Sequence, residues 1–189
     1  MKFSKAFLVI LFLAVIAFIC SCKKDSQSSS LGFLQVGHQW TYQESYQTQS
    51  DTMTLKITSD SSNIYTVVSN GLLGTQNMYW FVDGNYLEYY VKDSLGVKSQ
   101  PSIIYEINSQ VGNNWRSVPP GVTDTIYSRV AALNVADTTP VGIYSATAVN
   151  VSDSIIYASG PILKEYWSNS EGVVSIQGLY TLKLLSKNF

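Results

Sequence analysis

The sequence predicts an all-β fold in which an antiparallel sheet curves strongly, into either a partly open barrel or a sandwich. After Leu31, apolar and polar residues alternate along most of the chain, which is the pattern of half-buried strands. Only 13% of the 189 residues are charged, and tyrosine is abundant, a composition that favours strands over a helical bundle. No window of eleven residues shows the spacing of an amphipathic helix, so at most one short helical turn is expected before the first strand.

The first expected strands rest on alternation and on short apolar runs. Trp40, Tyr42, Glu44 and Tyr46 alternate with other residues and are expected on one face of a strand. The chain continues the strand pattern with a second alternating segment and two short apolar runs, at residues 53–58, 64–68 and 78–82.

An Asp-Gly-Asn turn at residues 83–85 predicts a β-hairpin between residues 78–82 and residues 86–91. In the second strand of this hairpin, the odd-numbered residues from Leu87 are expected on one face. The even-numbered residues from Tyr86 are expected on the other face.

The second half of the chain continues in the same way. Strands are expected over residues 103–107, 123–133, 144–151, 162–167 and 173–185. So many consecutive antiparallel strands must pair into a sandwich or curl toward a barrel to protect their edges. Residues 31–189 are therefore expected to form a single β domain, which is long enough to bury a core without disulfides.

A five-residue pattern occurs twice in this domain. Residues 36–40 read Val-Gly-His-Gln-Trp, and residues 111–115 read Val-Gly-Asn-Asn-Trp. In each copy the glycine gives the backbone freedom for a tight turn, and the tryptophan supplies a large apolar side chain for one end of the core. Two similar strand starts within one domain account for the pattern, and an internal duplication is the alternative.

The first 21 residues are predicted to be a signal peptide. Lys2 and Lys5 precede the 14 uninterrupted apolar residues 6–19. This run is shorter than the roughly 20 residues of a membrane-spanning helix and fits the apolar region of a secretion signal. An uncleaved membrane anchor is the alternative. Residues 23–30 are polar throughout and predict a flexible tether.

The residues around Cys22 carry a further signal. Ile19 stands at −3, Ser21 at −1 and Cys22 at +1, which resembles the lipobox of bacterial lipoproteins, and the Lys-Lys-Asp sequence at 23–25 is similar to that of lipoproteins of the Bacteroidetes group. The resemblance implies a diacylglycerol thioether on Cys22 and a further acyl chain on its amine; two or more acyl chains anchor a protein stably. It also implies attachment to the outer membrane, facing the periplasm or the cell surface. Because Cys20 and Cys22 are the two cysteines, no disulfide is expected in the body.

These signals divide the chain into three expected parts. They are a lipoprotein signal peptide at 1–21, a lipidated tether at 22–30 and the β domain at 31–189.

Four turn motifs follow one another along the body. They are the two Val-Gly-x-x-Trp segments, Thr-Pro-Val-Gly-Ile-Tyr at 139–144 and Glu-Tyr-Trp-Ser-Asn-Ser-Glu-Gly-Val-Val at 165–174. In this order they resemble the uncharacterised exported β proteins grouped as the DUF3108 and TapB-like families. The spacing here departs from the family pattern. The motifs are structural turns, so the resemblance implies an antiparallel, partly curled β fold and transfers no catalytic residue.

The sequence offers little catalytic or metal-binding chemistry. His38 is the single histidine, and its place at a strand start favours a hydrogen-bonding turn residue over a member of a catalytic triad. No cluster of histidine, cysteine and aspartate has the spacing of metal ligands, so no metal site, no cofactor and no catalytic residue are assigned. The net charge of −1 argues against a nucleic-acid partner.

Three glutamates in aromatic-rich strands leave a hydrolase hypothesis open. They are Glu88, Glu106 and Glu165. A glycosidase needs two carboxylates about 5 to 9.5 Å apart, and Glu106 or Glu165 would have to supply them. Glu88 is expected to point to water, because Leu87 and Tyr89 lie on the opposite face of the strand.

The densest aromatic cluster surrounds the turn at 83–85. Its candidate ligand-binding residues are Tyr79, Trp80, Tyr86 and Tyr90, which would line a cleft for a glycan or an apolar ligand. Cross-strand aromatic pairing that stabilises the hairpin is the alternative.

A lipid address joined to an aromatic-rich sheet without a catalytic cluster favours a non-enzymatic protein. We expect a binding or envelope-assembly domain tethered to the membrane by Cys22, whose partner is an envelope protein, a glycan or an apolar small ligand. A glycan-acting hydrolase and a purely structural assembly subunit are the alternatives. The sequence alone identifies no biochemical activity.

Overall fold

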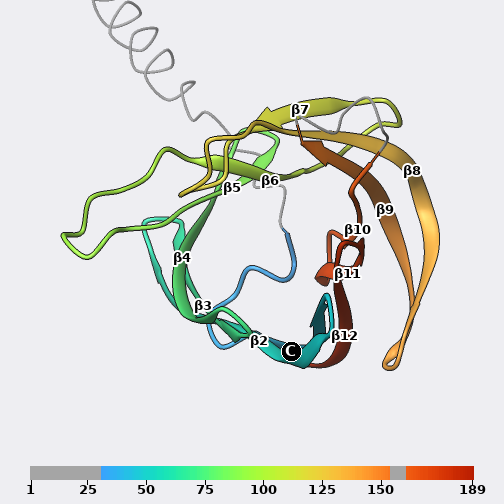
Figure 1. The fold of residues 1–189 in the computed structure, drawn as a ribbon, viewed down its shortest axis with the longest axis horizontal. Helices are drawn as coiled ribbons and strands as arrows, with labels where there is room; N and C mark the ends of the chain where they lie inside the picture. The colour runs from blue at the N-terminus through green and yellow to red at the C-terminus, as the bar shows by residue number, and fades with distance from the viewer. Residues whose placement is uncertain (1–30, 154–160) are drawn as a thin grey trace, which may run out of the picture.

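The computed structural model describes residues 31–153 and 161–189. Within these residues the chain forms twelve strands and no helix, and the strands make one antiparallel sheet that is nearly closed into a barrel (Figure 1). The predicted all-β, antiparallel, strongly curved fold is therefore confirmed. The expected signal peptide and tether lie outside the described residues.

The strands divide into two sets of six along the chain. The first set is β1 (Gln39–Tyr46), β2 (Gln49–Ser61), β3 (Ile64–Gly71), β4 (Gly74–Asp83), β5 (Tyr86–Tyr90) and β6 (Ser102–Glu106). The second set is β7 (Asn114–Ser117), β8 (Ile126–Thr139), β9 (Gly142–Asp153), β10 (Leu163–Ser168), β11 (Gly172–Gly178) and β12 (Tyr180–Asn188).

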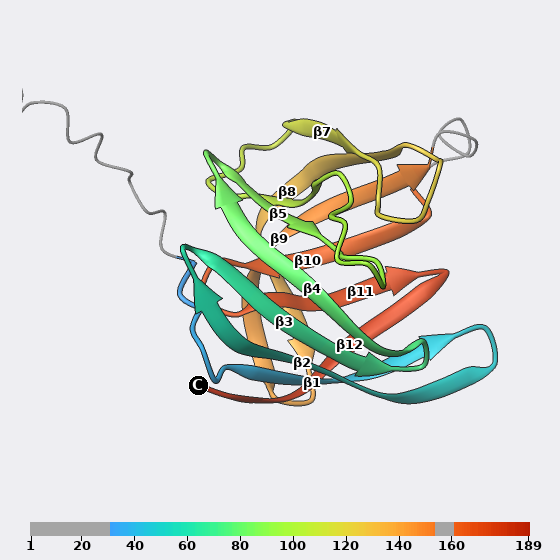
Figure 2. The same cartoon turned by 90° about the vertical axis from the view of Figure 1, so that its left-hand side faces the viewer.

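Each set is a meander, and the two meanders join through their first and last strands. The sheet order is β6-β5-β4-β3-β2-β1-β12-β11-β10-β9-β8-β7, and β1 pairs with β12 over eight residue pairs. Figure 2 shows β2, β3 and β4 side by side in one wall of the barrel. On the far side β6 and β7 approach each other, but no ladder joins them. We call this unpaired junction of β6 and β7 the seam.

Buried side chains fill one end of the barrel. Residues 31–38 reach β1 through a turn in which Leu34 N–H donates to the Leu31 carbonyl at 3.0 Å. This turn places Phe33 fully inside the core, where its ring meets that of Trp40 edge-on with centroids 6.0 Å apart. Figure 1 shows the segment, in blue, lying across the ring of strands.

The two copies of the five-residue pattern make the same backbone contacts. In each copy the glycine N–H donates to the carbonyl of one buried residue, and the carbonyl of the next residue accepts from the N–H of that same residue. This residue lies on the strand that pairs with the following one, β2 after the first copy and β8 after the second. This residue is Ile57 for residues 37–38 and Val130 for residues 112–113. The four distances lie between 2.9 and 3.0 Å. Both glycines have positive φ, 95° and 93°, which other residues rarely adopt, so the turn itself explains them.

Both copies send their tryptophan into the main core, as the sequence predicts. Trp40 is 2% exposed and Trp115 is 5% exposed. The Trp40 Nε1 donates to the Glu171 carbonyl at 2.6 Å, whereas the Trp115 Nε1 is buried and has no partner among the described residues. His38 lies 3.0 Å from the Phe33 carbonyl through Nδ1, so its expected role as a hydrogen-bonding turn residue is confirmed.

The long β8–β9 hairpin bends and packs on the outer face of the barrel. Its ladder is interrupted by register shifts between Val130 and Val135, and such bulges bend a strand. Beyond the bend, Asp137 Oδ2 accepts from Ser175 Oγ at 2.7 Å, and both side chains are buried. A small second core forms here around Ala146, Ala148, Tyr166 and Val174. Figure 1 shows the hairpin running down outside β10, β11 and β12.

Two predicted strand boundaries are corrected by the structure. The single strand expected over 173–185 is two strands, because the chain turns at Gly178 (φ 140°), where a Cβ would lie 2.2 Å from the Ile162 carbonyl oxygen. The strand expected to end at Leu133 continues to Thr139 as β8, because its polar tip stays paired with β9.

Candidate functional site

A cavity of about 380 Å³, widely open to solvent, is bordered by side chains from eight strands of the barrel. Its volume falls within the roughly 300–1,000 Å³ typical of small-molecule sites. Most of the lining is aliphatic, aromatic or thioether. Its buried members include Leu55, Trp80, Trp167 and Leu182. The remaining described members are Met53, Ser69, Met78, Tyr89, Ile104, Glu165, Val173, Ile176 and Tyr180.

Two methionines give part of this lining an adaptable surface. Met53 and Met78 border the cavity from β2 and β4 and are only partly buried. A methionine side chain is unbranched and polarisable, so it adjusts to ligands of different shape. The wall is therefore suited to apolar molecules in general and does not define one rigid outline.

Glu165 is the only acidic or basic residue in the described lining. Its side chain keeps some accessible surface because it borders the cavity, but protein atoms otherwise surround the carboxyl group. Burial raises the pKa of this carboxyl from 4.5 to about 7, although the hydrogen bond from Trp167 favours the charged form and opposes the shift. Near neutral pH the site therefore holds a carboxyl that either donates or accepts a hydrogen bond.

Trp80 contributes a hydrogen-bond donor that the protein does not use. Its side chain borders the cavity and is 5% exposed, and its Nε1 is buried with no partner among the described residues. A buried N–H without an acceptor is unfavourable by about 1–3 kcal/mol, and such groups in folded proteins generally meet a water or a ligand. This nitrogen has almost no accessible surface, so an acceptor in the cavity does not reach it in this conformation.

A second buried glutamate stands behind the lining and is already occupied. Glu44 is 3% exposed. Its Oε1 accepts from the Tyr180 hydroxyl at 3.0 Å, and its Oε2 accepts from Leu72 N–H at 2.8 Å. The Tyr180 pKa is raised by burial and by the nearby Glu44, so the tyrosine stays protonated and continues to donate. Tyr180 thus separates the Glu44 charge from the cavity.

The four aromatic residues singled out from the sequence fall on different surfaces. Trp80 borders the cavity, whereas Tyr79 and Tyr90 stack on each other across β4 and β5 with centroids 5.0 Å apart. The ammonium groups of Lys92 and Lys98 lie over these two rings. Tyr86 packs against the main core but does not border the cavity. The structure therefore brings only Trp80 of this set to the cavity.

The three glutamates considered for hydrolysis are also separated. Glu165 borders the cavity, while Glu106 Oε1 accepts from the Asn113 side chain at 3.0 Å near the seam. Glu88 lies on the outer face of β5, opposite the buried Leu87, and its side chain is partly buried. It lines a surface groove of about 660 Å³ beside the seam, and burial followed by the charge of Asp83 raises its pKa.

Sequence reasoning missed most of the cavity lining, although strand parity contains part of the signal. Met53 is in phase with the buried Leu55, Met78 with Trp80, and Tyr180 with Leu182. Side chains two residues apart on a strand share a face. The sequence alone does not reveal that these faces meet around one cavity.

The part of the chain that the structure describes contains no group of three or more histidine, cysteine, aspartate or glutamate side chains placed to hold a metal ion. It also contains no helix of the length and apolar character needed to cross a membrane. No protein-family model and no curated protein matches this chain.

Proposed function

We propose that this protein is a membrane-anchored binding protein that holds an apolar small molecule inside its barrel. The observation that carries the proposal is a cavity of about 380 Å³ whose mostly apolar lining contains one carboxyl group, that of Glu165. An apolar ligand with one polar group would cover the lining and form a hydrogen bond with this carboxyl group.

The surrounding contacts support binding and give no comparable support for hydrolysis. A glycosidase mechanism needs a second carboxylate about 5 to 9.5 Å from the first, free to act on the substrate. Glu165 is the carboxylate of the described lining, and both oxygens of Glu44 are held by Tyr180 and Leu72. The glycan-acting alternative therefore rests on no geometric observation of its own.

We propose further that Cys22 carries the lipid anchor and that the domain is attached to the outer membrane. The support is the apolar run followed by the lipobox-like residues Ile19, Ser21 and Cys22. Mass spectrometry of the protein purified from membranes should find an N-terminal Cys22 bearing a diacylglycerol and an acyl chain. A chain that begins at Met1 without lipid would overturn this part of the proposal.

Ligand binding is tested by filling the cavity. The full chain in phospholipid nanodiscs is titrated with bromine-labelled dodecanol, whose bromine quenches the fluorescence of nearby tryptophans such as Trp80 and Trp167. The variant Ser69→Phe places a ring in the lining, and Asn70→Phe places the same ring on the next, exposed residue of β3.

We expect saturable quenching in the wild type and in Asn70→Phe, and weak, non-saturable quenching in Ser69→Phe. Equal quenching in both variants would show that the cavity does not hold the probe. Far-ultraviolet circular dichroism of each variant checks that the sheet is retained.

A further inference from the structure

The connection between β5 and β6 carries an exposed apolar tip. Leu95 is 86% exposed and Val97 is 62% exposed. Figure 1 shows this connection, in yellow-green, reaching outward beyond the ring of strands. Single exposed apolar side chains are common on protein surfaces, but here two of them stand on one projecting turn, at residues 93–97. We call this segment the 93–97 turn.

The turn provides hydrogen-bond partners for its own backbone. Asp93 Oδ1 accepts from Leu95 N–H at 2.9 Å and from Val97 N–H at 2.8 Å. The Asp93 N–H donates to the Val97 carbonyl, and the Gly96 N–H donates to the Asp93 carbonyl, both at 3.0 Å. A backbone group that enters a lipid layer without a partner is unfavourable by several kcal/mol. Leu95 and Val97 can therefore leave water with the hydrogen bonds of their N–H groups intact.

Two lysines flank this turn. Lys92 and Lys98 pair across its base in an isolated bridge, and both are exposed. The Lys92 ammonium lies 4.3 Å from the centroid of the Tyr79 ring. The Lys98 ammonium lies 5.0 Å from the centroid of the Tyr90 ring, and the two rings stack on each other. Attraction to the rings therefore holds both cations on one face of the sheet, next to the apolar tip.

Apolar side chains flanked by cations fit an anionic phospholipid surface. The apolar groups can enter the boundary of the acyl chains, while the lysines stay among the headgroups, whose negative charge attracts them. Asp93 opposes part of this attraction, but residues 92–98 keep a net charge of +1, from two lysines and one aspartate. A stable protein interface needs roughly 800 Å² from each partner, which is far more than two side chains supply, whereas a bilayer needs no complementary surface.

We propose that the 93–97 turn inserts into an anionic phospholipid bilayer, with its two apolar side chains among the acyl chains and the two flanking lysines among the headgroups. This inference goes beyond ligand binding in the cavity and rests only on the anchoring part of the proposed function. A domain attached to the bilayer through Cys22 would meet the lipid at a high effective concentration. Two apolar side chains are then enough to fix the orientation of the barrel on the bilayer.

The test places a fluorescent reporter on the turn. Leu95→Trp is made in the full chain, which is reconstituted into phosphatidylglycerol nanodiscs with or without bromine on the acyl chains. Leu73→Trp is the matched control, because Leu73 is 83% exposed between β3 and β4 and has no lysine beside it in the sequence. The spectrum of the wild type, which has four tryptophans, is subtracted from each. We expect brominated lipid to quench the added tryptophan at position 95 but not the one at position 73.

The contribution of the lysines is measured in the Leu95→Trp background. Lys92→Gln combined with Lys98→Gln should lower the ratio of inserted to free turn by up to about 30-fold, whereas arginine at both positions should preserve it. Lys56→Gln combined with Lys183→Gln removes the same charge from exposed positions on β2 and β12 and should leave the quenching unchanged. Phosphatidylcholine in place of phosphatidylglycerol should weaken insertion as the first pair of substitutions does.

The outcomes separate insertion of the turn from the lipid anchor. Equal quenching at positions 95 and 73 would overturn the inference and leave a protein as the partner to test on this turn. Quenching that is the same without the two lysines would overturn the choice of an anionic surface. Quenching at position 95 in a chain whose Cys22 bears no lipid would overturn the anchor alone. A chain that does not stay with the nanodiscs would overturn both.

Discussion

The Trp167 Nε1 donates to Glu165 Oε2 at 2.8 Å, two residues apart on one face of β10. This bond holds the carboxyl against the indole at the edge of the cavity. Burial nevertheless dominates and raises the pKa of Glu165 to about 7. The pair therefore makes the stability of the barrel depend on pH.

Because the pKa of Glu165 rises from 4.5 to about 7 on folding, the folded state binds more protons than the unfolded state between these values. The stabilisation that comes from the protonated carboxyl is present below about pH 4.5 and is lost as the pH rises through 7. The glutamine of Glu165→Gln does not titrate, so the free energy of unfolding of this variant should not show this loss. Relative to the wild type, it should therefore increase by up to about 3 kcal/mol between pH 4.5 and pH 8.

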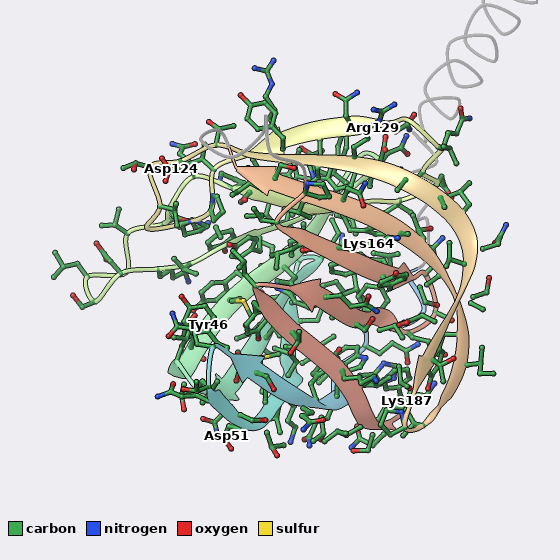
Figure 3. All side chains as sticks on the ribbon, turned by 45° about the vertical axis from the view of Figure 1, so that its right-hand side comes forward. Tyr46, Asp51, Asp124, Arg129, Lys164 and Lys187 are labelled. Atoms are coloured by element: carbon green, nitrogen blue, oxygen red, sulfur yellow. The ribbon has the colours of Figure 1, made fainter. Side chains whose placement is uncertain are left out.

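Urea denaturation at several pH values measures this difference. Lys164→Gln is a control for a polar change at the neighbouring position of the same strand, whose place on β10 is labelled in Figure 3. Parallel pH curves for the wild type and Glu165→Gln would contradict the prediction.

The hydrogen bond from Tyr180 to Glu44 predicts a second effect on stability. Tyr180→Phe removes the hydroxyl that serves Glu44 Oε1 and leaves this buried side chain with the Leu72 N–H alone. A buried acceptor that loses its partner is destabilising by about 1–3 kcal/mol. Urea denaturation should show this loss for Tyr180→Phe.

The matched control for this effect is Tyr46→Phe. Tyr46 is 48% exposed and is labelled in Figure 3, so loss of its hydroxyl should change the free energy of unfolding by less than about 0.5 kcal/mol. A similar change in both variants would mean that the contact between Tyr180 and Glu44 does not contribute to stability.

How far the sequence predicts this structure depends on the distance over which each feature forms. Parity within a strand is local, so the shared face of Trp40, Tyr42 and Glu44 and the opposite faces of Leu87 and Glu88 follow from the sequence and are found in the structure. The same rule separates Tyr79 from Trp80, because adjacent residues of a strand point to opposite faces. Grouping these two by sequence proximity therefore could not describe one site.

The cavity itself could not be predicted, because it depends on contacts between distant strands. Met53, Trp80 and Glu165 meet only after the two meanders have joined through β1 and β12. Curvature and closure of a sheet come from twist and from bulges such as those of β8. The buried contact between Asp137 and Ser175 arises in the same way, from the bent hairpin lying over the barrel.

The two tryptophans of the repeated pattern allow a direct comparison of a satisfied and an unsatisfied donor. The Trp40 Nε1 donates to the Glu171 carbonyl, and the Trp115 Nε1 has no partner in the part of the chain that the structure describes. Replacement by phenylalanine removes a similar volume at both positions, but only Trp40→Phe breaks a hydrogen bond. We expect Trp40→Phe to be more destabilising than Trp115→Phe by about 1 kcal/mol, measured by urea denaturation. The reverse order would show that packing differences outweigh the hydrogen bond.

The seam predicts that the two junctions of the barrel open at different rates. β1 pairs with both β2 and β12, so its backbone groups are used on both edges. Among the described strands, β6 pairs only with β5, and β7 pairs only with β8. Amide hydrogens exchange when their hydrogen bonds open, and strands paired on one edge open at lower free energy than strands paired on both.

Hydrogen–deuterium exchange followed by mass spectrometry tests this difference on the intact protein. Peptides that cover residues 102–106 and 114–117 should take up deuterium earlier than peptides that cover residues 39–46. An apolar ligand in the cavity should slow exchange in the first set, because Ile104 of β6 borders the cavity. Equal protection of β1, β6 and β7 without ligand would mean that the seam is closed in solution, and a ligand would then have to enter through an end of the barrel.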